Sequence, residues 1–176
     1  MTPTTVREVA APPDSHVAQL LPGAYFHDAW AVDLADGRAN AMSLALRVFQ
    51  QTPPWIDGLM GLRNRLAGLA GLKNVGTLAD LDPGKPSAAY QLGDRVGIFT
   101  LCLRSEAEVL MGIDDKHLKV VVSLHRAQLQ ADARTTATIT TVVHVHNWLG
   151  RLYMLPVTPV HRVIAKRMTG LLLQPA

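Results

Sequence analysis

The segment TTVVHVHNWLGRLYMLPVTPVHRVIAKRM, residues 140–168, changes its hydrophobic period partway along and thereby decides the fold. Up to His146 the residues alternate, as in a strand with one apolar face. The residues that share the apolar face are Ala137, Ile139, Thr141, Val143 and Val145. Further on, Thr158 and Pro159 form a cap followed by a first-turn proline, which predicts the start of a final helix. A strand followed by a long C-terminal helix is therefore expected. The inner face of this helix is expected to carry Val160, Val163, Ile164, Met168 and Leu171, with His161, Arg162, Lys166 and Arg167 mostly outside it.

The run before this segment, residues 117–128, alternates in the same way and is expected to pair antiparallel with residues 135–147. A turn near residues 130–133 would join the two runs. Matching their apolar faces fixes the register, because a shift of one residue would put valines opposite histidines. The expected pairs are Leu118–Val145, Val120–Val143, Leu124–Ile139, Lys119–His144 and His117–His146. His144 and His146 are thus expected on the sheet face that points away from the final helix.

Working back along the chain, the period predicts three more strands and two helices. The strands are expected over 24–34, near 96–103 and near 109–113. The first helix is expected to carry on its inner face Met42, Ala45, Leu46 and Phe49. The second helix, which follows Thr52, is expected to carry on its inner face Trp55, Ile56, Leu59, Met60, Leu66 and Leu69. The fold class is α+β: a curved antiparallel sheet wrapped around a long C-terminal helix, with two further helices after the first strand. Residues 1–21 are expected to form an extended N-terminal arm before a single domain over 22–176.

Composition limits the class of protein. The chain has 176 residues, 48% of them hydrophobic and 18% charged, as in one compact domain with a sizeable core. A net charge of +3 does not predict a nucleic-acid-binding face. No segment resembles a signal peptide or a membrane span, so a cytoplasmic location is expected. The single cysteine, Cys102, lies in an apolar run and is expected to be a buried, inert thiol.

Polar residues are expected to gather at one end of the sheet. Asp115 and His117 come from one turn, and His146, Asn147 and Arg151 come from the next. One interpretation is a metal site, because two imidazoles in a His-x-His strand start about 7 Å apart and can converge on one ion. A second is a solvated polar face of the sheet, and a third is a hydrogen-bonded cluster.

The cluster interpretation predicts a mainly structural lock that fixes where the last strand ends. Asn147 would bond the following turn, and Arg151 would form a two-pronged pair with Asp114 or Asp115. No metal and no cofactor is predicted. Elsewhere, Glu106 and Glu108 flank a hairpin turn, and nothing in the sequence distinguishes them from surface charges.

Three segments together resemble a known family: PGAYFHDAWAV with PPWIDGLMGLRNRLAGLAGL, then EVLMGIDDKHLKVVVSL, and then the segment at 140–168. From about Pro22 to Met168 the chain resembles the family catalogued as domain of unknown function 2867. The positions that carry the resemblance are Asp114, Asp115, His117, Leu118, His146, Asn147, Gly150, Arg151, Tyr153, Pro159, His161 and Arg162. Lys116 and Lys119 depart from the family pattern, which has Arg and Asp at these places.

The resemblance implies a helix-grip fold of the Bet v 1 or START-like class, which encloses an apolar cavity, and it assigns no reaction. It adds Tyr153 and His161 to the polar cluster. Seven strands are usual in that class, and the sequence predicts five, so the missing pair is expected within residues 73–95.

The leading functional hypothesis is a non-catalytic module that binds a small apolar or amphipathic molecule in an internal cavity. The residues expected to line it are Phe26, Trp30, Trp55, Met60, Phe99, Leu101, Met111, Val120, Val143 and Ile164. One alternative is a completely packed core with no cavity. Another is a small cyclase- or hydrolase-like enzyme that uses a His, Asp and Tyr cluster, because fold alone does not exclude catalysis. A homodimeric interaction or accessory domain is a further alternative.

Overall fold

The computed structural model describes residues 5–35, 38–69, 77–78, 80–82, 84–128 and 135–174. Its elements, in chain order, are β1 (Arg7–Glu8), the 3₁₀ helix η1 (His16–Leu20), β2 (Phe26–Leu34), α1 (Ala41–Gln50), α2 (Pro54–Leu69), the 3₁₀ helix η2 (Ser87–Ala89), β3 (Arg95–Val96), β4 (Phe99–Arg104), β5 (Glu108–Asp114), β6 (Leu118–Gln128), β7 (Thr135–Val145), α3 (Trp148–Gly170) and the 3₁₀ helix η3 (Leu171–Leu173). Among the described helices, none has the length and apolarity needed to cross a membrane.

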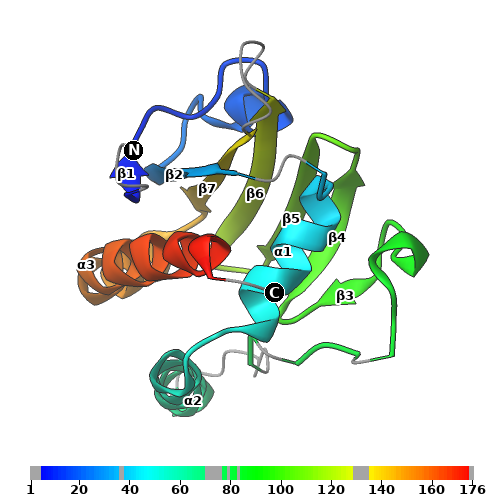
Figure 1. Ribbon diagram of the computed structural model, residues 1–176. Helices are drawn as coiled ribbons and strands as arrows, with labels where there is room; N and C mark the ends of the chain where they lie inside the picture. The colour runs from blue at the N-terminus through cyan, green and yellow to red at the C-terminus, as the bar shows by residue number, and fades with distance from the viewer. Residues whose placement is uncertain are drawn as a thin grey trace.

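The strands form one antiparallel sheet in the order β1-β2-β7-β6-β5-β4-β3, so the first long strand pairs with the last. Helix α3 packs on β2 and β7, and α1 packs on β5 and β6, on the same face of the sheet (Figure 1). We call this the inner face. The predicted α+β class is confirmed: a curved antiparallel sheet with a long C-terminal helix against it and two helices after the first long strand.

The predicted register between β6 and β7 is confirmed. Leu124 lies opposite Ile139, and Lys119 lies opposite His144. Beyond the strand ends, the His146 amide donates to the His117 carbonyl at 2.8 Å. The turn predicted near residues 130–133 lies outside the described residues.

The described sheet contains seven strands where the sequence predicts five. Of the two additional strands, β1 lies at residues 7–8 and β3 at residues 95–96. The prediction that both lie within residues 73–95 is therefore wrong for β1, and β3 only begins at the last residue of that range. Both are two residues long, too short for a pattern of alternation to mark them.

The final helix begins at Trp148 and not near Thr158, which corrects the sequence prediction. Asn147 is the N-cap, and its side chain accepts from the Gly150 amide at 3.1 Å. Pro156 and Pro159 lie inside the helix, where each removes one backbone donor. The carbonyls that lose these donors belong to Leu152 and Leu155, whose side chains are exposed, so water can serve them.

The earlier start changes which side of α3 meets the sheet. Val160 and Val163, expected inside, are exposed, whereas His161 turns toward the sheet. The buried residues of α3 are Gly150, Met154, Ala165, Met168 and Thr169. Thr158, expected to cap the helix, donates its hydroxyl to the Met154 carbonyl one turn back at 2.8 Å.

The outer face of the sheet is covered by residues 5–21, which we call the N-terminal strap (Figure 1). Strand β1 pairs with the edge of β2, and η1 packs across the sheet, with Val17 fully buried against Leu110, Val121 and Val142. The interpretation of the outer face as a solvated surface is therefore wrong in its central part, where Ser123 and Thr140 are also fully buried.

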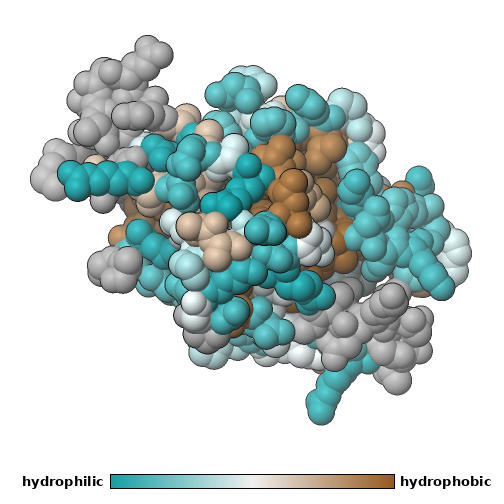
Figure 2. All heavy atoms as spheres, turned by 90° about the vertical axis from the view of Figure 1, so that its right-hand side faces the viewer, coloured by the Kyte–Doolittle hydropathy of each residue, from teal (hydrophilic) through white to brown (hydrophobic). Residues whose placement is uncertain are grey.

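The opposite edge of the sheet, at β3 and β4, is more open. Figure 2 shows this side of the molecule, where hydrophobic atoms form a band between hydrophilic flanks. Leu92 is exposed in the turn before β3. Cys102 on β4 is also exposed, contrary to the prediction of a buried thiol, because it follows the inward-facing Leu101 and therefore points to the opposite side of the strand.

Candidate functional site

The inner face of the sheet is organised in cross-strand rows that run beneath α1 and α3. Three successive rows, each running from β2 through β7 and β6 to β5, are Phe26–Val143–Val120–Ile113, Asp28–Thr141–Val122–Met111 and Trp30–Ile139–Leu124–Val109. Every position except Asp28 and Thr141 is apolar. The rows therefore present an apolar surface with one polar place near the β2 edge.

Part of this apolar surface is accessible, although it lies in the middle of the sheet. Ile113, Val120 and Val122 are only partly buried. On the outer face of the same strand β6, by contrast, Val121 is 4% exposed and Ser123 is fully buried beneath the strap. At these three positions the inner face is thus incompletely covered.

Asp28 is a charged residue on the inner face, and its side chain is only 1% exposed. One carboxylate oxygen accepts from the Trp30 indole nitrogen at 3.1 Å. The other lies 3.3 Å from His161 Nε2, which reaches down from α3. The His161 ring also packs edge-on against Phe26, with ring centroids 5.5 Å apart. These four residues, which we call the Asp28–His161 cluster, join α3 to the first long strand.

Sequence reasoning found three members of this cluster but missed Asp28. The sequence does indicate that Asp28 points inward, because Asp28 lies two residues from both Phe26 and Trp30 in a strand and therefore shares their face. A carboxylate at an inward strand position needs a partner when it is buried. The partner, His161, was expected to lie outside the helix stripe because the helix was expected to start too late.

Most of the predicted apolar set lies on the inner face. Phe26, Trp30, Phe99, Leu101, Met111, Val120 and Val143 come from its strands, and Ile164 packs against it from α3. The two predicted residues that lie on α2 are not fully buried. Trp55 is 46% exposed, and Met60 is only partly buried, whereas Ile56 is fully buried. The inward stripe expected for α2 is therefore wrong at Trp55 and at Leu59, which is also exposed.

The polar cluster at the end of the sheet has the geometry of a lock between two turns. Asp115 accepts from the backbone amides of His117 and Leu118 at 2.7 and 3.0 Å. Asn147 caps α3 with its oxygen and donates from its amide nitrogen to the Lys116 carbonyl at 2.9 Å. The close approach of the His117 ring to the Asn147 side chain joins both turns.

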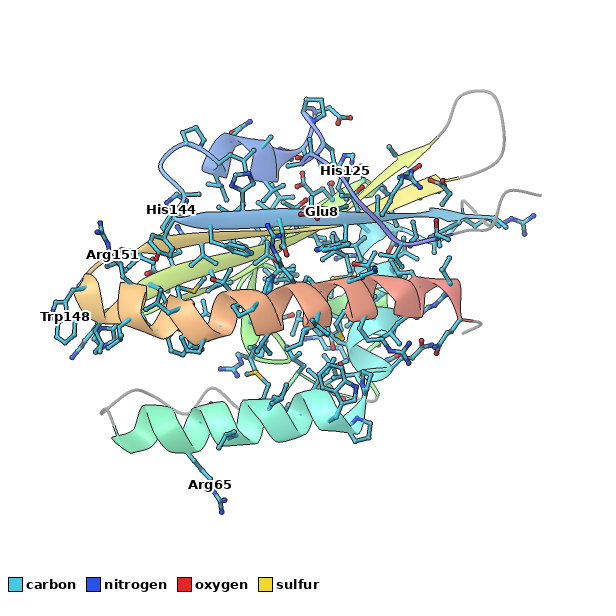
Figure 3. The ribbon with its side chains drawn as sticks, turned by 90° about the vertical axis from the view of Figure 1, so that its left-hand side faces the viewer. Glu8, Arg65, His125, His144, Trp148 and Arg151 are labelled. Atoms are coloured by element: carbon cyan, nitrogen blue, oxygen red, sulfur yellow. The ribbon has the colours of Figure 1, made fainter. Side chains whose placement is uncertain are left out.

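Two expectations for this cluster need correction. Asp114 pairs with His146 at 3.0 Å, and among the described residues neither Asp114 nor Asp115 pairs with Arg151. Arg151 is exposed, because it lies in the first turn of a helix that starts before it and points away from the sheet (Figure 3). His144, proposed as a possible second metal ligand, instead lies 2.9 Å from the Leu20 carbonyl of the strap. Within the part of the chain that the structure describes, no three His, Cys, Asp or Glu residues are grouped to hold a metal ion.

Replacing Asn147 with alanine is expected to lower the free energy of unfolding by about 1–2 kcal/mol, because the helix loses its cap and the Lys116 carbonyl loses its donor. The matched variant Arg151→Ala removes an exposed side chain and is expected to change stability by less than about 0.5 kcal/mol. Urea denaturation of both variants measures the difference. Equal destabilisation by the two changes would contradict the lock as described.

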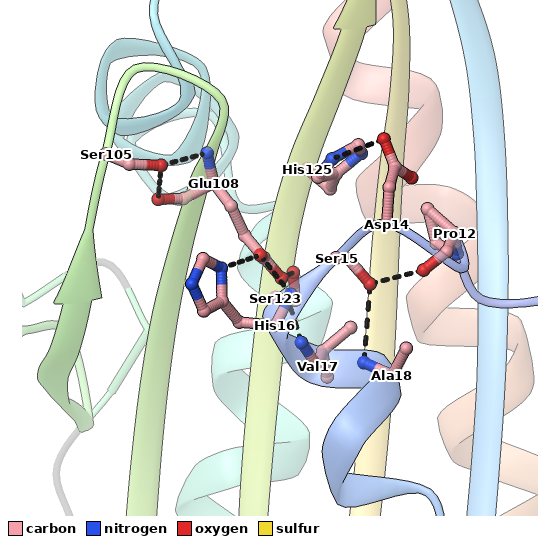
Figure 4. Close-up of polar contacts among 10 residues, drawn as sticks. All are labelled: Pro12, Asp14, Ser15, His16, Val17, Ala18, Ser105, Glu108, Ser123 and His125. Atoms are coloured by element: carbon pink, nitrogen blue, oxygen red, sulfur yellow. Dashed lines mark hydrogen bonds and ion pairs between the residues drawn. The ribbon is translucent and has the colours of Figure 1, made fainter.

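A second buried carboxylate, Glu108 on β5, fastens the strap to the outer face (Figure 4). One of its oxygens accepts from the His16 amide at 2.6 Å and lies 2.9 Å from His16 Nδ1. The other oxygen accepts from the Val17 amide at 3.1 Å and from the Ser123 hydroxyl at 2.8 Å. Glu108 is 2% exposed, so its interpretation as a surface charge is wrong.

The ionisation of Glu108 is set by two opposing effects. Burial raises the pKa of this carboxyl group, because a charge loses its hydration. The hydrogen bonds from the His16 amide, the Ser123 hydroxyl, the Val17 amide and the His16 ring stabilise the charged form, and together they lower the pKa below the ordinary value for Glu. Glu108 therefore holds the strap as a carboxylate.

The comparison with protein families gives one match. The family model described as "Protein of unknown function (DUF2867)" matches residues 20–168, which is most of the chain. The match includes the inner face, the Asp28–His161 cluster and the lock, but it begins at the end of the strap. No curated protein and no solved structure matches the chain.

Proposed function

The chain belongs to the DUF2867 family, a family of unknown function, and on this premise we propose that it is a non-catalytic module that binds a small apolar or amphipathic molecule on the inner face, between α1 and α3. The helix-grip resemblance supports the proposal, because proteins of that class hold apolar ligands between a curved sheet and a C-terminal helix. A cytoplasmic location belongs to the same proposal and rests on the sequence alone.

The observation that carries the proposal is the partial exposure of Ile113, Val120 and Val122. These side chains belong to the central strands β5 and β6 and face the core, where complete packing would bury them. Apolar surface of this kind gains free energy when a ligand removes it from water, at about 25 cal/mol per Å². A mostly apolar ligand fits this surface.

The Asp28–His161 cluster suggests how one end of the ligand would be recognised. Asp28 lies in the same cross-strand row as Val122, with Thr141 between them. A few fixed polar groups beside an apolar surface are the usual means of orienting a ligand. We expect a ligand with an apolar body and one hydroxyl or amine group, which would bind near Thr141 and the cluster.

The same cluster is the observation that favours the catalytic alternative. A carboxylate that orients a histidine is a common arrangement in general base catalysis. His146, a histidine of the predicted polar cluster, lies on the outer face at the end of the sheet, where its side chain is 41% exposed. An enzyme would therefore depend on His161, whose contacts with Asp28 and Phe26 also have a purely structural use.

The binding proposal predicts that freshly purified protein binds a fluorescent fatty-acid analogue, and that Val122→Phe weakens this binding about tenfold by filling the accessible surface. The matched control is Val163→Phe, which makes the same change on the exposed side of α3. Fluorescence titration measures both affinities, with unfolding curves to confirm that each variant folds. Equal affinities of the two variants for the probe would show that the probe does not bind at Val122 on the inner face.

Native mass spectrometry of the wild-type protein provides the direct test. A reproducible added mass that stays unchanged on incubation supports binding without turnover. An added mass that converts into another in the wild type, but not in His161→Gln, would replace the binding proposal by the catalytic alternative. If the protein binds neither a copurified molecule nor the fluorescent analogue, the binding proposal and the catalytic alternative both lose their support.

A further inference from the structure

Helix α3 has a second apolar side that is largely exposed in the described structure. Trp148 is 73% exposed, Leu155 is 66% exposed and Val163 is 60% exposed. Leu152 and Val160 are exposed as well. The spacing of Trp148, Leu152 and Leu155 is four and then three residues, which places them on one side of a helix. A stripe of large exposed apolar residues of this length marks an interaction surface rather than ordinary surface composition.

The charged side chains of α3 itself are all of one sign. The exposed basic residues of α3 are Arg151, Arg162, Lys166 and Arg167, and no Asp or Glu occurs between Trp148 and Gly170. Arg151 and Arg162 lie along one flank of the stripe, and Arg167 lies along the other, as the helical period requires. Arg162 has one carboxylate nearby, that of Glu8 at 3.8 Å, and both side chains of this pair are about half exposed. Lys166 lies on the line of the stripe itself, five turns after Trp148, and its Nζ is 5.8 Å from the centre of the Trp30 ring. The surface is thus apolar over the first part of the helix and cationic beside it and toward its C-terminal end.

We propose that this side of α3 docks onto a membrane surface rich in anionic phospholipids. A helix with Trp and Leu on one side and Lys or Arg beside them lies in the plane of a bilayer, with its apolar side chains among the lipid chains and its cations at the headgroups. The opposite side of α3 remains packed on β2 and β7, so the helix can present the stripe without leaving the sheet. Figure 3 shows the helix along the outside of the molecule, with Trp148 at its end and directed away from the sheet.

The charge pattern favours a lipid surface over a second copy of the chain. In a dimer formed through two α3 helices, the arginines and lysines of each copy would face a helix that carries no carboxylate. Like charges placed opposite one another across an interface cost several kcal/mol. An anionic bilayer supplies negative charge along the whole helix, whatever its orientation in the plane.

The test is cosedimentation of the purified full chain with phosphatidylcholine vesicles that contain, or lack, 30% phosphatidylserine, at about 0.1 M salt. We expect binding to the anionic vesicles and little binding to the neutral ones. Leu155→Ser and Trp148→Ser are each expected to reduce the partition coefficient about tenfold. Arg162→Glu and Arg167→Glu are each expected to reduce it about fivefold or more.

The matched controls are Leu92→Ser, an exposed leucine in the turn before β3, and Lys119→Glu on the outer face of the sheet. Neither is expected to change the partition coefficient. Absence of binding to anionic vesicles, or equal loss with Leu92→Ser and Leu155→Ser, would overturn the proposal. A dimer in light scattering that becomes a monomer with Leu155→Ser would overturn it in favour of a second copy. Val122→Phe, which fills the ligand surface proposed above, is expected to leave the partition coefficient unchanged, so the two proposals can fail separately.

Discussion

Gly150→Ala is expected to lower the free energy of unfolding by about 2–3 kcal/mol. A Cβ atom at this position would overlap the His117 carbonyl oxygen and lie 2.8 Å from Val145 Cγ1. The carbonyl is backbone and already accepts the His146 amide, so it cannot move aside without breaking the lock. The first turn of α3 must shift instead, and urea denaturation should report the loss.

The matched control is Gly58→Ala in α2. A Cβ at Gly58 would meet nothing within 4 Å, and alanine favours the helix over glycine. This variant is expected to raise stability by about 0.5–1 kcal/mol, provided that α2 unfolds together with the rest of the chain. A Gly150→Ala protein as stable as the wild type would mean that α3 does not approach β6 as closely as described.

Glu108→Gln is expected to destabilise the protein by about 2–3 kcal/mol and to release the strap. Four contacts converge on the two carboxylate oxygens, and three of them are donated by the His16 amide, the Val17 amide and the Ser123 hydroxyl. A glutamine keeps the shape but replaces one oxygen with an NH₂ group, which faces donors and cannot accept from them. Limited proteolysis should then cut the chain between residues 5 and 21 faster than in the wild type.

The same substitution should remove part of the pH dependence of stability. The pKa of Glu108 in the folded state lies below its unfolded value, so the carboxylate contributes stability above the unfolded pKa. This contribution is lost as the pH falls from about 4.5 through the lower folded pKa. The wild type should therefore lose more stability than Glu108→Gln over this range.

Glu106→Gln provides the control for both measurements, because Glu106 is exposed in the turn before the same strand. It should leave stability, proteolysis and pH dependence nearly unchanged. Equal proteolysis rates for Glu106→Gln and Glu108→Gln would show that the strap is held by apolar contacts such as those of Val17 alone.

The register of β6 against β7 could be predicted from sequence because strand parity is a local property. Placing Leu124 opposite Ile139 fixes the position of Lys119 and His144 without any knowledge of the rest of the molecule. The start of α3 could not be predicted in the same way. Asn147 and Thr158 are both capping residues, and the choice between them depends on contacts with the turn at Lys116, far away in sequence.

The strap and the Asp28–His161 cluster depend on still longer separations. Glu108 looks like a surface charge until η1 lies across it, and no period in residues 5–21 predicts that placement. Asp28 could have been recognised by its inward parity, but its partner lies on α3, 133 positions further along the chain. Local pattern therefore predicts the sheet well and leaves the polar contacts that join distant elements unpredicted.

The order of the sheet has a consequence for the growing chain on the ribosome. His16 and Glu108 are 92 positions apart, so at about 5–20 residues per second the strap waits roughly 5 to 20 seconds for the residue that fastens it. Strand β2 waits longer, because β7 is the last strand to be made. Until then Trp30 and Val32 have no strand on that side of β2 to pair with, and the nascent protein carries an apolar edge that chaperones can recognise.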